Sequence, residues 1–136
     1  MNQYYSPEKA METASTLNLA FLGDCVYELY VRDTLVRCYP DKPAREIHRL
    51  ATELVCATAQ AKVAAHIFDR LDEEEKTVYL RARNAHPGHL PKNAAPADYH
   101  AATAIEAVVG YLYLCGKNER LAELFEQSGL FPVEGT

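Results

Sequence analysis

The chain has 136 residues, of which 49% are hydrophobic and 24% are charged, and its formal net charge at pH 7 is −5. This length predicts one domain spanning residues 1–136, and the composition excludes an intrinsically disordered chain. Charged residues interrupt the longest apolar runs, and the N-terminus lacks the basic and then apolar build of a signal peptide. We therefore expect a cytoplasmic protein with no membrane span.

Helical patterns account for nearly all of the chain, and prolines separate them. The sequence predicts five principal helices: over 15–37, over 44–68, from just after Asp72 to about 82, over about 97–115, and over about 117–128. In the first helix, Leu19, Leu22, Val26 and Leu29 recur at helical spacing and predict one apolar stripe. No segment has the pattern of a strand pair with a tight turn, so the predicted fold class is all-α.

The boundaries of these helices carry their own signals. Asp72 followed by three glutamates is typical of an N-cap and an acidic first turn, which we interpret as a solvated helix start. Pro96 suits a first helical turn, and Gly116 and Gly129 suit helix ends. The four cysteines, Cys25, Cys38, Cys56 and Cys115, fit no zinc spacing, and we interpret them as small buried hydrophobic residues.

The charges are segregated along the chain. Acidic residues gather in 69–75 and in the last helix, whereas residues 81–92 (RARNAHPGHLPK) hold two arginines, a lysine and two histidines without an acid. The negative net charge argues against a nucleic-acid binder, but this segregation permits a basic face.

Two carboxylates lie inside otherwise apolar helices. Asp24 follows Gly23 in LAFLGDCVYELY, and Glu106 lies in TAIEAVVGYLYL. Glycine and a buried charge are both unfavourable there, unless the glycine allows a close helix contact and the charge is compensated. One interpretation pairs each acid with a buried arginine such as Arg32 or Arg83. The other brings Asp24 and Glu106 together on a divalent cation such as Mg²⁺, which prefers oxygen ligands.

The segments FLGDCVYELYVR and TAIEAVVGYLYL resemble the two metal-binding helices of the ribonuclease III catalytic domain. The pattern Gly23-Asp24-x-Val26-Tyr27-Glu28 and the basic segment with Arg81-x-Arg83-Asn84-Ala85 and then Pro91-Lys92-Asn93 are similar to its short bacterial branch, Mini-ribonuclease III. This resemblance extends from about Leu17 to Leu124. It implies a ribonuclease III-like helical fold that forms a homodimer and has no separate double-stranded-RNA-binding domain.

The resemblance implies that Asp24 and Glu106 are the catalytic, metal-binding carboxylates, with Mg²⁺ as the cofactor and Mn²⁺ as a substitute. Full-length ribonuclease III has further acids at the positions of Ala20 and Thr103, and their replacement is expected of the short branch. We add Glu28, one turn after Asp24, as a candidate acid in the outer shell of the metal.

The implied function is a metal-dependent endoribonuclease that cleaves double-stranded RNA and matures precursor large-subunit (23S) ribosomal RNA, with a ribosomal protein or pre-ribosome as a further candidate partner. Arg81, Arg83, Asn84 and Lys92 are the candidate RNA-binding residues, since phosphate and sugar contacts dominate duplex recognition. Two alternatives remain. One is a non-catalytic RNA-binding or ribosome-associated module of the same fold, and the other is a helical dimer without a role in nucleic-acid binding.

Overall fold

The computed structural model describes residues 4–13, 15–85 and 95–130, and these residues form helices and connecting turns without a strand. The helices are α1 (Pro7–Thr13), α2 (Thr16–Cys38), α3 (Ala44–Val55), α4 (Ala57–Ile67), the 3₁₀ helix η1 (Phe68–Arg70), α5 (Glu73–Arg83), α6 (Pro96–Leu114) and α7 (Asn118–Gln127). The all-α prediction is confirmed. No helix among these residues has the length and apolar character that crossing a membrane requires.

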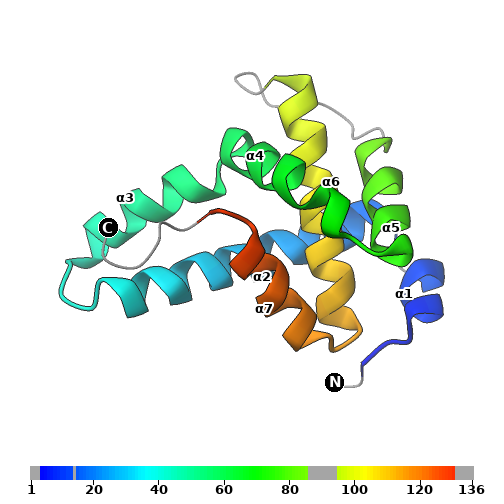
Figure 1. Ribbon diagram of the computed structural model, residues 1–136, viewed down its shortest axis with the longest axis horizontal. Helices are drawn as coiled ribbons and strands as arrows, with labels where there is room; N and C mark the ends of the chain where they lie inside the picture. The colour runs from blue at the N-terminus through cyan, green and yellow to red at the C-terminus, as the bar shows by residue number, and fades with distance from the viewer. Residues whose placement is uncertain (1–3, 14, 86–94, 131–136) are drawn as a thin grey trace.

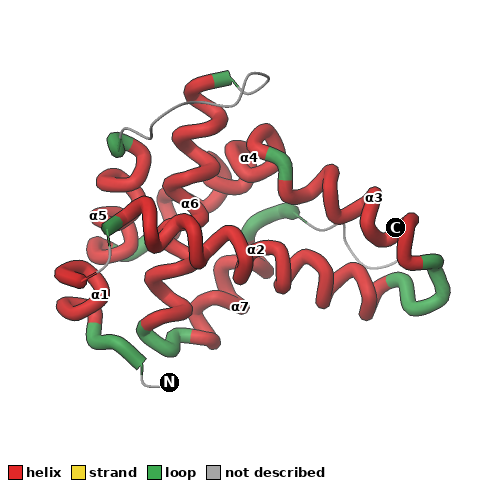
Figure 2. Tube along the Cα trace, turned by 180° about the vertical axis from the view of Figure 1, so that it is seen from behind, coloured by secondary structure: helices red, strands yellow, loops and turns green. Residues whose placement is uncertain are grey.

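Helix α6 is the centre of the fold (Figure 1). It crosses α2, its most extensive neighbour, and it also packs against α4, α5 and α7. Its buried side chains include Ile105, Val108, Tyr111 and Leu112, which are all nearly inaccessible to solvent. The C-terminal half of α2 extends away from this core with α3 alongside it (Figure 2). The crossing of α2 and α6 therefore lies at the core, where buried area holds both helices in place.

Two features of the helix pattern differ from the prediction. Helix α1 was not expected; it begins at Pro7 after Ser6, whose Oγ accepts a hydrogen bond from the backbone N–H of Lys9 at 3.1 Å. The predicted helix over 44–68 is divided, because Cys56 has extended backbone angles of φ −69° and ψ 160°. The chain changes direction at this residue, so that α3 packs against α2 whereas α4 packs against α6.

The helix boundaries predicted at Asp72, Pro96, Gly116 and Gly129 are confirmed. Asp72 caps α5 in a capping box with Glu75, Pro96 is the first residue of α6, and both glycines have positive φ, 69° and 72°.

The acidic start of α5 is not wholly solvated, which corrects the interpretation made from the sequence. Glu75 is only 1% exposed, and its carboxylate accepts hydrogen bonds from Arg120 of α7 at 2.8 and 2.9 Å. Arg120 also donates to the Arg70 carbonyl oxygen at 2.7 Å. This ion pair therefore links the start of α5 to η1 and α7.

The surface of α2 corrects two further expectations. Leu19 and Val26 are buried as predicted, but Leu29 is 63% exposed, so the predicted stripe is only partly buried. The cysteines were predicted to be buried, and this is wrong: Cys25, Cys38 and Cys56 are exposed, Cys115 is partly exposed, and all four are free thiols. Cys38 and Cys56 lie at helix ends rather than on packed faces, which accounts for their exposure.

Candidate active site

Two glycines allow α2 and α6 to approach closely where they cross. A Cβ atom on Gly23 would lie 1.7 Å from the backbone carbonyl oxygen of Glu106, and one on Gly110 would lie 2.0 Å from that of Leu19. Ordinary contacts of this kind are longer than 3.4 Å, so any larger residue would force the helices apart. The expectation that Gly23 permits a close helix contact is confirmed.

This contact brings together the two isolated carboxylates. Asp24 follows Gly23 on α2, and the backbone of Glu106 on α6 lies directly against Gly23. The two side chains are close enough for the charge of Asp24 to act on Glu106. The expected burial of both acids is only partly correct, because Asp24 is exposed to solvent and Glu106 is half-buried. The pair thus lies at the edge of the core, where a ligand from solvent can reach it.

The electrostatics of the pair are those of an uncompensated acidic site. Burial, with a further contribution from the negative charge of Asp24, raises the pKa of Glu106 to about 8. The interpretation that each acid pairs with an arginine is not supported, because Arg32 binds Glu28 at 3.0 Å and Arg83 contacts Asn84 at 3.4 Å. Two neighbouring carboxylates that pair with no cation among the described residues favour the binding of a divalent cation.

A third helix contributes a polar group that was not identified from the sequence. The Nε2 of Gln60, on α4, donates a hydrogen bond to Oε2 of Glu106 at 3.2 Å. Gln60 is only 2% exposed. In the sequence, the feature that could have indicated it is a single amide among the small residues of ATAQAKVAAHI. The phenol of Tyr27 is also buried near Glu106, and its oxygen has no hydrogen-bond partner among the described residues.

Ala20 and Thr103, which stand where full-length ribonuclease III has additional acids, are both buried. Ala20 is 6% exposed and Thr103 is 8% exposed, and the Thr103 hydroxyl donates to the Tyr99 carbonyl oxygen at 3.0 Å within α6. Among the described residues, no group of three or more histidine, cysteine or acidic side chains could hold a metal. A cation at Asp24 and Glu106 would therefore have two carboxylate ligands and complete its shell with water, an arrangement that Mg²⁺ accepts.

Three of the four candidate RNA-binding residues are described by the structure, and the two arginines among them point in different directions. Arg81, Arg83 and Asn84 are exposed at the C-terminal end of α5, and Lys92 lies outside the described residues. Because residues two apart on a helix project to nearly opposite sides, Arg81 and Arg83 diverge. Arg81 lines a surface hollow that also contains Glu8, Glu12 and Glu74, so Arg83 is the better placed of the two to bind an anion.

Comparison with known proteins places this chain in a family. Residues 17–117 match the Ribonuclease III domain. The chain is 44% identical to Mini-ribonuclease 3 of Symbiobacterium thermophilum over 124 residues, which cover 90% of this chain and 94% of the relative. It is 46% identical to Mini-ribonuclease 3 of Desulfitobacterium hafniense over 126 residues, which cover 93% and 79%.

A solved structure agrees with the sequence relatives. The crystal structure of a protein from Fusobacterium nucleatum matches with a TM-score of 0.80 at 30% identity, and the match covers 87% of this chain and 95% of that one. Together with the two carboxylates that meet at the α2–α6 crossing, these similarities establish that the chain belongs to the ribonuclease III family, in its Mini-ribonuclease 3 branch, and is an endoribonuclease.

Proposed function

We propose that this endoribonuclease cleaves double-stranded RNA with Mg²⁺ bound by Asp24 and Glu106. The observation that carries the proposal is the convergence of these two acids, 82 residues apart in sequence, at the glycine contact between α2 and α6. Ribonuclease III enzymes depend on divalent metals and act on double-stranded RNA, and the donor set of two carboxylates fits Mg²⁺, with Mn²⁺ as the expected substitute. When bound, the cation supplies water activation and stabilisation of charge on the phosphodiester.

The roles of the protein residues follow from their chemistry. Asp24 is exposed and contributes a carboxylate on the solvent side, whereas Glu106 contributes a half-buried carboxylate held against the core. No nucleophilic side chain is required for hydrolysis of this type. Glu28 is bound to Arg32 on the surface of α2, and we retain it as a candidate outer-shell acid that would act through water or through Asp24.

A cleavage assay with duplex RNA, with and without Mg²⁺, tests the proposal. We expect Asp24→Asn and Glu106→Gln to abolish cleavage while the duplex remains bound. Asp33→Asn is the matched control, because Asp33 is on α2 and its exposed carboxylate binds the nearby Arg37 in a surface ion pair at 3.0 Å. Duplex binding by the wild-type protein without cleavage at any Mg²⁺ concentration would contradict the proposal and favour the non-catalytic module.

We propose that Arg81, Arg83, Asn84 and Lys92 contact the phosphates and sugars of the duplex. The support is the exposure of the first three at the end of α5, next to the segment that contains Lys92. Arginine binds phosphate through several donors at once, and its binding weakens as salt concentration rises. Since Arg81 is near three acids, we assign the larger contribution to Arg83.

We also propose that the protein forms a homodimer through the exposed side of α2. Several large apolar residues are exposed along this side: Leu17, Phe21, Leu29 and Val36. Phe21 is 84% exposed, and an apolar surface of this kind is typical of a protein–protein interface. Asp24 lies between Phe21 and Leu29 in sequence, so a second copy of the chain on this side would border the active site.

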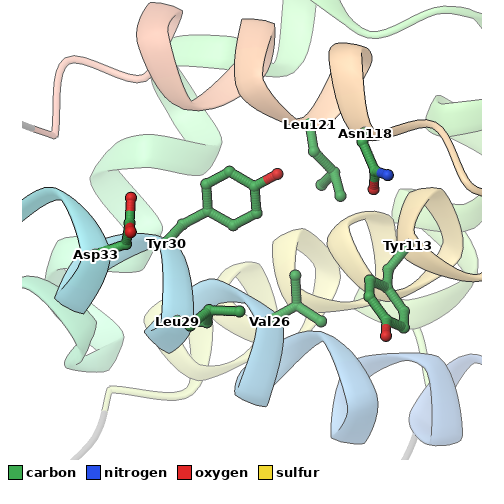
Figure 3. Close-up of a pocket in the computed structure, with 7 residues that line it drawn as sticks. All are labelled: Val26, Leu29, Tyr30, Asp33, Tyr113, Asn118 and Leu121. Atoms are coloured by element: carbon green, nitrogen blue, oxygen red, sulfur yellow. The ribbon is translucent and has the colours of Figure 1, made fainter.

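A hollow beside this side of α2 supports the dimer. It has a volume of about 350 Å³ and lies between α2 and the end of α6 with α7, as Figure 3 shows. Its lining is mainly apolar or aromatic, with one acid and one amide: Val26, Leu29, Tyr30, Asp33, Tyr113, Asn118 and Leu121. Leu29 belongs both to the hollow and to the exposed side of α2, so one partner surface could cover the two together.

Light scattering of the eluting protein tests the dimer. We expect twice the chain mass at micromolar concentration for the wild-type protein, and the single-chain mass for Phe21→Glu, because burying a charge at an apolar contact is unfavourable. Leu80→Glu is the matched control, since Leu80 is an exposed leucine that belongs to α5 and not to α2. A wild-type protein that elutes as a monomer would refute the dimer.

For the biological substrate we propose precursor 23S ribosomal RNA in the cytoplasm, presented by a pre-ribosome or a ribosomal protein. Membership of the Mini-ribonuclease 3 branch supports this proposal. Incubation of the precursor with the enzyme, alone and with ribosomal proteins, followed by mapping of the new RNA ends, tests it. Absence of a discrete cut in every precursor sample would contradict it.

A further inference from the structure

Gln60 is a buried side chain that is not one of the two proposed metal ligands, Asp24 and Glu106. It is one of the few polar residues with almost no exposure in the described part of the chain. A buried carboxamide without hydrogen bonds lowers the free energy of unfolding, so its presence requires a partner. That partner is the Glu106 carboxylate, which accepts a hydrogen bond from Gln60 Nε2 at 3.2 Å across the α4–α6 contact.

The hydrogen bond from Gln60 restricts the orientation of the Glu106 carboxylate. Gln60 projects from α4, which packs along α6 and carries the buried residues Val63, Ala64 and Ile67. The amide is therefore held by the core, and it engages Oε2 of Glu106 from the protein interior. Fixing one carboxylate oxygen in this way limits the rotation of the side chain and leaves coordination capacity on the carboxylate for a cation.

The chemical type of the residue at this position is also informative. A lysine or arginine here would neutralise Glu106 and compete with a divalent cation, and another acid would add to the repulsion between Glu106 and Asp24. A neutral amide donates a hydrogen bond without changing the charge of the pair. It therefore adds no charge to the pair, while it orients one of the two carboxyl groups that would bind Mg²⁺.

We propose that Gln60 is a positioning residue that holds the Glu106 carboxylate in place for the divalent cation. This inference rests on the proposed function, in which Asp24 and Glu106 bind that cation. Residues that support metal ligands through hydrogen bonds typically change metal affinity or activity by about 10- to 100-fold when replaced. Gln60 acts through Glu106 and contacts neither the cation nor the RNA.

The test compares Gln60→Met with the wild-type protein, because methionine has a similar length but no hydrogen-bond donor. Calorimetric titration with Mn²⁺ in the absence of RNA gives the affinity directly, and single-turnover cleavage at increasing Mg²⁺ gives the cation requirement. We expect a loss of about tenfold in Mn²⁺ affinity, a matching rise in the Mg²⁺ needed for half-maximal cleavage, and cleavage near the wild-type rate at saturating Mg²⁺.

Tyr27→Phe is the matched control, since its phenol is buried near Glu106 without a hydrogen-bond partner among the described residues. This variant should keep the wild-type Mn²⁺ affinity. Equal Mn²⁺ affinity in Gln60→Met and the wild-type protein would overturn the inference and leave the proposed function intact. Failure of the wild-type protein to bind Mn²⁺ or to cleave would instead overturn the proposed function, and with it the role of Gln60.

If Gln60→Met does not fold, the wild-type protein provides the second measurement. The side-chain NH₂ resonances of Gln60 are followed by NMR during a Mg²⁺ titration. A shift that saturates together with Mg²⁺ binding supports the inference, because the acceptor of this hydrogen bond then changes its charge environment. Resonances that stay unmoved through saturation would overturn it.

Discussion

Replacing Gly23 by alanine should destabilise the protein, although alanine is the better helix former. In an unconstrained helix the change would raise the free energy of unfolding by about 0.5 to 1 kcal/mol. Here the new methyl group would lie 1.7 Å from the carbonyl oxygen of Glu106. Relief of this overlap requires α2 and α6 to separate by roughly 2 Å, because non-bonded atoms sit about 3.5 to 4 Å apart.

The cost of this separation exceeds the gain in helix propensity. Overpacking in a core typically costs about 1 to 3 kcal/mol, and here the clash is with backbone, which cannot rotate away. We therefore expect Gly23→Ala to lower the free energy of unfolding by about 2 kcal/mol or more in urea titrations. The same movement would displace Glu106 from Asp24, so the affinity for Mn²⁺ should fall as well.

Cys25→Ala provides the control, because Cys25 is exposed on the same helix two residues away. It should change the free energy of unfolding by less than about 0.5 kcal/mol. A Gly23→Ala variant that is as stable as the wild-type protein would refute the argument that glycine is present for the helix contact.

Three further outcomes are expected. The pKa of Glu106 is raised from 4.5 to about 8 in the folded protein, so folding of the metal-free protein takes up a proton between pH 4.5 and pH 8. Its free energy of unfolding should therefore fall as the pH rises from 4.5 to 8. Urea titrations at pH 5 and pH 8.5 should show a smaller fall for Glu106→Gln than for the wild-type protein. Glu75→Gln removes the buried acid of the ion pair with Arg120 and should lower the free energy of unfolding by about 2 to 3 kcal/mol in the same assay. Glu74→Gln, at an exposed neighbouring position, should lower it by less than about 0.5 kcal/mol. Arg83→Ala should weaken duplex binding and reduce the slope of log affinity against log salt by about 1, and Arg37→Ala at the far end of α2 should leave both unchanged.

Each of these outcomes can fail on its own. An unchanged pH dependence in Glu106→Gln would mean that another group controls the stability between pH 5 and 8.5. Equal losses for the Glu75 and Glu74 variants would contradict the assignment of the buried ion pair. A wild-type salt slope in Arg83→Ala would remove that residue from the RNA contact surface.

The local pattern of the chain was enough to predict the helical class, most helix boundaries and the two unusual carboxylates. Proline and glycine act through their own backbone geometry, so Pro96, Gly116 and Gly129 marked helix ends without knowledge of the fold. Asp24 and Glu106 could be identified because an acid in an apolar helix is unfavourable without a partner.

Contacts between distant segments could not be predicted in this way. The burial of Glu75 depends on Arg120, 45 residues later, and the hydrogen bond from Gln60 depends on Glu106, 46 residues later. Exposure of the cysteines and of Phe21 likewise depends on which side of each helix meets a neighbour. Helical periodicity reports which residues share a face, but the packing of α6 against α2, α4 and α5 decides which faces are covered.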